Sequence, residues 1–291
     1  MLGRPDSGTV METADEMETV TTDGANARSA ACVQSAGFLL ELSPDWLILR
    51  ASENAHSFLS EYHQRLVGNP LADFTLAQPL HDLRNSLARQ RGSSGIARAY
   101  RVRLIDEPRY FDIAFQSLGD TILLEGLQSP VDGLGDALGS VSRLIEGLSA
   151  TERSRTLDGA ARRMRALTGY DRVTLLLGDE RVESSRGQMP ALRTSGELAP
   201  IVAESSDAAV RLFPRDEQRP IEEALLRAPT PSQIEDLRSA GIASLLRVPV
   251  MLNGEKLGHF QCENRTARSP SFELHAAAEL FAQIFGMLLP G

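Results

Sequence analysis

A histidine, a glutamine and a glutamate alternate along one predicted strand near the end of this chain. Residues 245–264 predict two strands joined by Asn253-Gly254, a dipeptide that supplies the positive φ angles of a two-residue hairpin turn. The period of two in the second strand places His259, Gln261 and Glu263 on one face. An imidazole in such a place can bind iron or hydrogen-bond a ligand. The face is therefore either a polar pocket or a wet surface.

Composition and charge exclude several classes of function. The chain has 291 residues and a formal net charge of −9, which argues against a broad electrostatic interface with nucleic acid. No apolar run is long enough to span a membrane, and residues 1–30 lack the apolar core of a secretory signal. Cys32 and Cys262 have no metal-ligand spacing and suggest no disulfide framework. We therefore expect a cytoplasmic protein without a membrane or nucleic-acid partner, and no nucleophile triad, phosphate loop or zinc motif is present.

The pattern of apolar residues predicts two mixed units. A disordered arm over residues 1–30 precedes the first unit, residues 31–128, and a linker over 129–140 leads to the second unit, residues 141–291. In the first unit, strands are predicted at 38–42, 46–50, 100–104, 110–116 and 121–127, and helices at 52–59 and 79–89. In the second unit, helices are predicted at 134–148, at 151–168 (from a Thr151 cap to Gly169) and at 274–288, with strands at 172–177, 245–252 and 255–262.

Three segments give the chain a family resemblance. Residues 167–173, LTGYDRV, are similar to the LTGYDRVMVY segment of bacterial phytochromes, and residues 257–264, LGHFQCEN, are similar to the family's WGLIACHH segment. Residues 37–56 resemble the opening of the phytochrome PAS domain. The resemblance spans about residues 33–288. It implies an α+β protein in which a PAS domain is followed by a GAF domain, each with a central antiparallel sheet flanked by helices, without the third photosensory domain and the output module.

The same resemblance implies where a tetrapyrrole would bind. Residues 201–213 align with the start of the family's helix that opens with the Pro-Ala-Ser-Asp-Ile-Pro motif. Arg219 aligns with an arginine that binds a propionate, and a guanidinium–carboxylate pair is a suitable role for it; the alternative is a solvated arginine on a helix. The remaining pocket positions are taken by Tyr170, Glu204, Gln233 and Glu263, with His259 and Gln261 on the chromophore side of the last strand.

The tether to a chromophore is missing from the sequence. In the family a cysteine belongs near residues 18–20, which hold none, and Cys32 lies too close to the first strand and is expected to be a buried or incidental thiol. A bound bilin would therefore be non-covalent. We expect the other four histidines to lie at the surface: His56, His63, His81 and His275.

Three functions follow from these interpretations. The leading one is a sensory protein that holds haem or a biliverdin-like bilin non-covalently, with His259 as a candidate ligand of haem iron, and signals through contacts with an unknown partner protein. The second is a haem-degrading, haem oxygenase-like enzyme in which Gln233, Gln261 and Glu263 hold oxygen and water. The third is a ligand-free module that forms a homodimer through the helices at 134–148 and 274–288. For His259 itself, the alternative to a ligand-binding role is a structural histidine at the strand edge or in the core.

Overall fold

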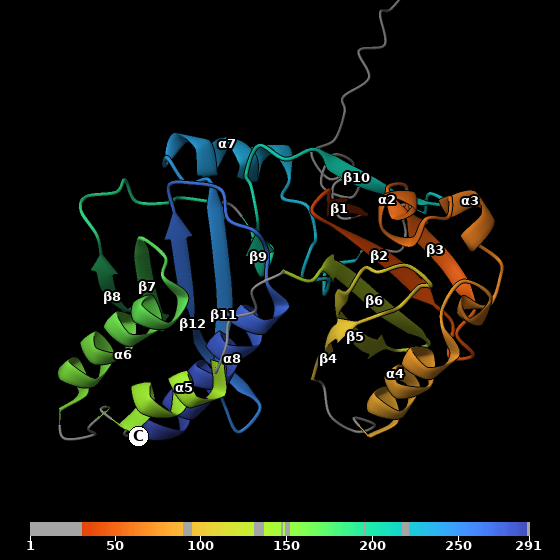
Figure 1. Ribbon diagram of the computed structural model, residues 1–291. Coiled ribbons are helices and arrows are strands. Elements are labelled where there is room, and N and C mark those ends of the chain that lie inside the picture. Colours follow the sequence, from red (N-terminus) through yellow and green to blue (C-terminus); the bar gives the residue numbers. More distant parts are fainter. Residues whose placement is uncertain are drawn as a thin grey trace, which may run out of the picture.

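The structure is a computed structural model that describes residues 31–89, 95–130, 137–146, 148, 152–194, 196–216 and 221–289. The predicted arm, the Thr151 cap and Arg219 lie outside these residues. Within them the α+β class is confirmed, because two antiparallel sheets are each flanked by helices (Figure 1). None of the helices in this part of the chain is long and apolar enough to cross a membrane.

The N-terminal unit is built on a sheet of seven strands in the order β1-β10-β3-β2-β6-β5-β4. Its interior side carries a core of aromatic and aliphatic side chains that includes Phe38, Phe111 and Phe115. The strands are β1 (Cys32–Gln34), β2 (Gly37–Leu42), β3 (Ile48–Ser52), β4 (Ala97–Val102), β5 (Phe111–Leu118), β6 (Thr121–Gln128) and β10 (Ala209–Phe213). The helices are α2 (Ala55–Leu59), α3 (His63–Leu66), the 3-10 turn η1 (Leu71–Asp73) and α4 (Ala77–Arg89).

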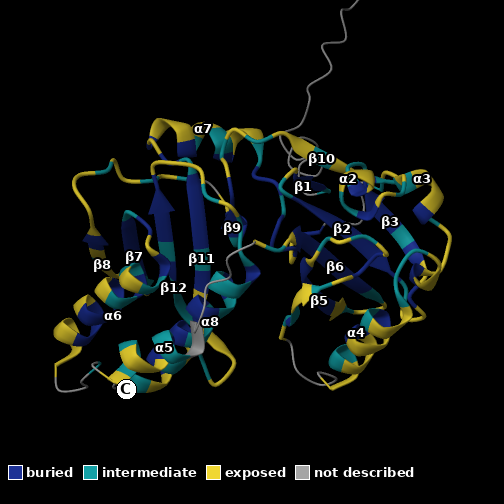
Figure 2. Ribbon diagram, in the orientation of Figure 1, coloured by how far each residue is buried: buried dark blue, intermediate teal, exposed yellow. Residues whose placement is uncertain are grey.

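The C-terminal unit is built on a sheet of five strands in the order β8-β7-β12-β11-β9. One face packs on the helices α5, α6 and α8, and these elements share one apolar core (Figures 1 and 2). The strands are β7 (Arg172–Leu177), β8 (Glu180–Ser185), β9 (Ile201–Val202), β11 (Ser244–Leu252) and β12 (Glu255–Asn264). The helices are α5 (Ala137–Glu146), α6 (Arg153–Thr168), α7 (Pro231–Ser239) and α8 (Phe272–Leu288).

Local signals in the sequence predicted several of these elements. The β11–β12 hairpin turns at Asn253 and Gly254, whose φ angles are 53° and 86°, as the Asn-Gly pair requires. Helix α6 ends at Gly169, which adopts the left-handed conformation with a φ of 70°. The predicted strand over residues 46–50 instead runs from Ile48 to Ser52, because Trp46 takes a φ of 66° in the turn before it.

The predicted helix start at residues 201–213 is wrong. This segment forms two strands, β9 and β10, and β10 pairs with both β1 and β3 of the N-terminal sheet. Phe213 precedes Pro214, and a residue before proline is biased toward extended backbone. The alignment with a helix therefore fails where the chain crosses from one unit to the other.

Strand β1 is enclosed by residues that are distant in the sequence. On one side Val33 pairs with Val210 of β10, and on the other side it forms a bridge with Arg227. Backbone hydrogen bonds from Gln34 N to Leu226 O (2.9 Å) and from Ala228 N to Cys32 O (2.8 Å) hold the second side. The start of the N-terminal unit is thus fixed between two parts of the C-terminal half, and Cys32 is buried as expected.

Candidate functional site

The strand order brings the polar residues predicted from the sequence into one patch. Strand β12 lies between β7 and β11, so that Glu263 pairs with Arg172 and Gln261 pairs with Thr174 and Arg247. Alternation sends the next residues, such as Cys262, to the opposite apolar face. We call this patch the polar face; it consists of Arg172, Thr174, Arg247, His259, Gln261 and Glu263.

An ion pair between Arg172 and Glu263 occupies the middle of the polar face. Nε of Arg172 donates to Glu263, and the two side chains are only 2% and 1% exposed. The other two guanidinium nitrogens donate to the carbonyls of Met189 and Pro190, both at 2.8 Å. Gln261 adds a hydrogen bond to the Glu263 carboxylate at 2.7 Å. Every nitrogen of Arg172 has a partner, and this is the condition under which a buried ion pair is tolerated.

The ion pair also holds a covering segment against the sheet. Met189 and Pro190 belong to the stretch after β8, and Met189 packs on a small apolar cluster that includes Leu198 and Val202. Because Arg172 binds two consecutive carbonyls of this stretch, the segment closes over the polar face. Sequence reasoning missed Arg172, although it lies two residues after Tyr170 in the quoted LTGYDRV segment.

His259 is half-buried at the edge of the polar face. Burial, together with the positive charges of Arg247 and Lys256, lowers the pKa of His259 to about 4, so that the ring is neutral at pH 7. Nη2 of Arg247 lies 3.5 Å from Nδ1 of His259. A guanidinium only donates, so Nδ1 is the acceptor and the ring proton belongs on Nε2. The free lone pair of His259 therefore points toward a cation, and this arrangement does not favour iron; the iron-ligand role stays a prediction.

Basic residues gather around one carboxylate beside His259. Lys256 Nζ lies 2.8 Å and Arg247 Nη1 lies 3.5 Å from Glu197 Oε1, and Arg227 donates to the Glu197 carbonyl at 2.9 Å. The hydrogen bond from Lys256 lowers the pKa of Glu197, despite partial burial. Arg247 is thus already paired with a carboxylate of the protein itself. Neither Arg227 nor Arg247 was singled out from the sequence.

The remaining predicted pocket residues do not join the polar face. Gln233 is buried in the capping box of α7, where its side chain bonds Thr230 N at 3.0 Å and Glu197 O at 3.2 Å. Glu204 is exposed and accepts from Ser206. Tyr170 is buried in the apolar core on the helix side, under the guanidinium of Arg268. Arg219 lies outside the described residues.

Comparison with known proteins follows the same division of the chain. Sequence models match the PAS fold at residues 23–125 and the GAF domain at residues 152–289. The chromophore-binding domain of Stigmatella aurantiaca phytochrome P1 is 22% identical, with a TM-score of 0.73, over 90% of this chain and 96% of that chain. The chain has a phytochrome-like PAS–GAF core.

Other solved structures share this core. The chromophore-binding domain of a bacteriophytochrome from R. palustris is 21% identical, with a TM-score of 0.71, over 90% of this chain and 95% of that chain. The photosensory core module of the Stigmatella aurantiaca phytochrome is 20% identical, with a TM-score of 0.70, and only 58% of it is covered. A search of curated protein sequences found no match. At these identities the likeness concerns the fold.

The residues of this phytochrome-like core do not fit a tetrapyrrole on the polar face. Arg172 and Glu263, the two buried charged side chains of this face, are bonded to each other, and Arg172 also binds the segment at Met189 and Pro190, so neither charge is free to bind a ligand. Cys262 is buried on the opposite face, and burial raises its pKa to about 12, so it cannot serve as a thiolate. The best-formed pockets in the described part of the chain include one between α5, α6 and α8 and one beside Trp46, and no residue of the polar face lines either of these.

Proposed function

We propose that this chain is a phytochrome-like sensory module that acts through protein contacts as a homodimer, with the polar face of its GAF sheet closed by its own side chains. The observation that carries the dimer is an open apolar groove between α5, α6 and α8. The observation that argues against a tetrapyrrole is the buried Arg172–Glu263 pair. The downstream partner is a protein of unknown identity.

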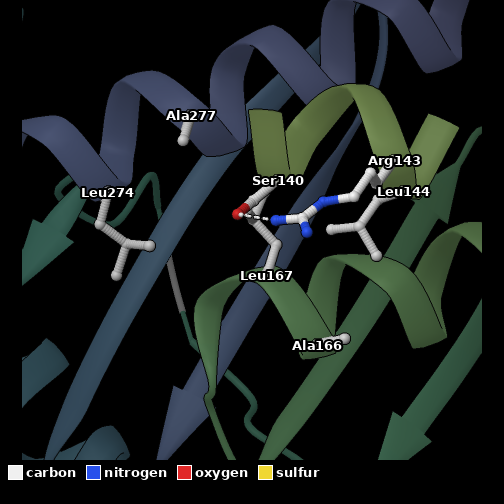
Figure 3. A pocket seen from close by; sticks show the side chains of 7 residues that line it. All are labelled: Ser140, Arg143, Leu144, Ala166, Leu167, Leu274 and Ala277. Carbon is white, nitrogen blue, oxygen red and sulfur yellow. Dashed lines mark hydrogen bonds between the residues drawn. The ribbon is translucent and has the colours of Figure 1, made fainter. Parts of the chain in front are cut away.

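The groove is formed by the three helices α5, α6 and α8, which lie together on one face of the GAF sheet (Figure 3). It has a volume of about 300 Å³. Its rim includes the Arg143 side chain, which contacts Ser140 Oγ at 3.4 Å. Side chains from all three helices line it: Ser140, Arg143 and Leu144 from α5, Ala166 and Leu167 from α6, and Leu274 and Ala277 from α8.

An apolar stripe continues from the groove along α8. Ala277, Leu280, Ile284 and Met287 follow one another at helical spacing, so they lie on one side of the helix. Leu280 and Ile284 are half-buried, whereas Met287 is 63% exposed. A large apolar side chain of that exposure beside a groove is typical of a protein contact surface.

We propose a second copy of the same chain as the partner, because each copy carries both a groove and an apolar stripe that could fill it. In a two-fold dimer the same patch meets itself, so the exposed Met287 end of the stripe of one copy can enter the groove of the other, and the reverse. The contact uses the helices predicted at 134–148 and 274–288, of which α5 and α8 are the described parts. Movement of these helices would pass a signal between copies.

The haem-degrading alternative needs a polar network around one ligand. Gln261 and Glu263 do lie together on the polar face, but Gln233 caps α7 instead. Glu263 is bonded to Arg172 and Gln261 is bonded to Glu263, so both side chains already have partners within the protein, and Gln233 lies away from them. This alternative requires haem to bind first, and titration of the protein with haemin tests that requirement.

Light scattering at micromolar concentration tests the homodimer. We expect twice the chain mass of 31.7 kDa for the wild type and a shift toward the monomer for Met287→Glu, because the carboxylate would be buried in the contact. Tyr62→Glu is a matched control, since Tyr62 is equally exposed, at 63%, on the PAS domain. A monomeric wild type, or equal masses for both variants, would refute the proposal.

A further inference from the structure

Several polar side chains on the outer face of the PAS sheet contact the GAF domain, and three of them lie on β4, β5 and β6. Gln116 of β5 donates to the Glu223 carbonyl at 2.9 Å. Arg98 of β4 donates to Glu279 of α8 at 2.5 Å and lies 3.0 Å from Nδ1 of His275. Glu125 of β6 accepts from two backbone N–H groups of the GAF domain. The last contact differs from the others because a buried carboxyl group accepts hydrogen bonds from uncharged backbone N–H groups.

Glu125 lies at the centre of the PAS sheet. It pairs with Leu39 of β2 and Ala114 of β5, and the residue is 2% exposed. Its Oε2 accepts from Leu225 N at 2.9 Å and its Oε1 accepts from Leu226 N at 2.7 Å. Each carboxylate oxygen therefore has one backbone donor, and none of the described residues contributes a cation to an ion pair with this carboxylate.

The backbone that Glu125 binds connects three parts of the molecule. The carbonyl of Leu226 accepts from Gln34 N of β1 at 2.9 Å, and the carbonyl of Leu225 accepts from Ile201 N of β9 at 3.3 Å. Strand β9 in turn pairs with β11 of the GAF sheet. Weakening the hydrogen bonds of Glu125 would thus also affect the contacts of this backbone with β1 and with β9, which pairs with β11 beside the polar face.

The nearest cation to Glu125 is already bound to another carboxylate. Burial raises the pKa of Glu125 to about 7, although the N–H groups of Leu226 and Leu225 and the charge of Arg98 oppose the rise. Arg98 itself is bound to Glu279. On the same face of the sheet, Glu41 and Arg50 pair with each other, and Asp112 accepts from Ser129 and Arg101. The other charged or titratable groups on the elements packed against this face include Arg98, Tyr100, Glu222, Glu223, Arg227, Glu273, His275 and Glu279.

We propose that Glu125 is a protonation-dependent clamp that fixes residues 221–228 of the GAF domain to the PAS sheet. The ionised carboxylate accepts from both N–H groups. When the acid is neutral, one of its oxygens carries a proton. That O–H group faces a backbone N–H group, so two donors point at each other and one of the two hydrogen bonds weakens. Proton uptake near neutral pH therefore weakens the hydrogen bond of the Leu225 or the Leu226 backbone N–H to Glu125. It also removes the buried negative charge.

Carbon-13 NMR of glutamate carboxyl groups, combined with amide exchange, tests the clamp on the full chain. We expect one carboxyl signal with a midpoint near pH 7 that is missing in Glu125→Gln. We also expect the exchange of the Leu225 or Leu226 amide, corrected for its intrinsic rate, to rise about tenfold or more as the pH falls from 8 to 6. The amide shifts of these two leucines report the midpoint in the wild type, so the test stands even if the variant does not fold.

Gln116→Ala is the matched control, because it removes the neighbouring contact to residues 221–228 without removing a titratable group. The control should keep the titration near pH 7. A Glu125 midpoint below pH 5 would overturn the proposal. So would a midpoint near 7 with unchanged protection of both amides, since the carboxyl would then titrate without loosening anything.

Discussion

Arg172 and Glu263 are direct register partners on β7 and β12, and their side chains form a buried ion pair with every guanidinium nitrogen bonded. The two residues are 91 positions apart in the chain. Their pairing closes the face of the GAF sheet on which the sequence placed a ligand. The pair is therefore both a structural element of the domain and the reason why the polar face is not an open pocket.

Removing one member of this pair should destabilise the protein strongly. In Arg172→Met, Glu263 keeps only the Gln261 bond as a buried carboxylate, and the carbonyls of Met189 and Pro190 lose their donor. We expect the free energy of unfolding to fall by about 3–5 kcal/mol. Urea unfolding monitored by circular dichroism measures it.

The double variant Arg172→Met with Glu263→Leu is the control for this prediction. It removes both charges and leaves apolar side chains of similar size, so the part of the loss that comes from the unpaired carboxylate should be recovered, while the Met189 and Pro190 carbonyls still lack their donor. A single variant within about 1 kcal/mol of the wild type would show that the pair is not buried in solution as it is here.

His259 should make the folded state sensitive to acid. Its pKa is about 4 in the folded protein, below the ordinary value of 6.5. Between these values the unfolded chain binds more protons, so stability is complete above pH 6.5 and is lost as the pH falls toward 4. Because glutamine does not titrate, we expect the free energy of unfolding of His259→Gln to fall by about 1–3 kcal/mol less than that of the wild type over this pH range. Thermal unfolding from pH 7.5 to 4 measures the difference, and parallel curves for the two proteins would contradict it.

Arg98 should couple the PAS domain to the helix of the proposed dimer. Its ion pair with Glu279 is largely buried on the Arg98 side, at 11% exposure. Arg98→Met should lower the free energy of unfolding by about 2–3 kcal/mol, because Glu279 and His275 lose their shared partner. Arg103→Met is the matched control, since the Arg103–Asp106 pair is exposed and should contribute less than about 1 kcal/mol. Equal losses for both variants would argue against a special role for Arg98.

Elements with local signals could be predicted from the sequence. The Asn253-Gly254 turn, the Gly169 end of α6 and the period-2 pattern of β12 each depend on neighbouring residues, and all three are confirmed. The capping box at Thr230 and Gln233 is also local. That pattern could have identified Gln233 as a helix cap rather than a pocket residue.

Features that depend on distant partners could not be predicted. Strand β10 forms because β1, almost 180 residues earlier, offers it an edge, whereas the alignment with the family had placed the start of a helix there. His275 was expected at the surface but is 1% exposed, because Arg98 of the other domain lies over it. Its spacing of three from Phe272 and Ala278 on the buried side of α8 was an available signal. His56 and His81 are exposed as predicted, and His63 is half-buried against Phe213.

The absorption spectrum of purified protein after addition of biliverdin, and separately of haemin, tests the closed polar face most directly. We expect no saturable one-to-one complex, because a tetrapyrrole would have to separate Arg172 from Glu263 and displace the segment at Met189 and Pro190. The spectra should match those of the free pigments in the same buffer. A one-to-one complex with a red-shifted bilin band, or a sharp haem band that is lost in His259→Ala, would contradict the account.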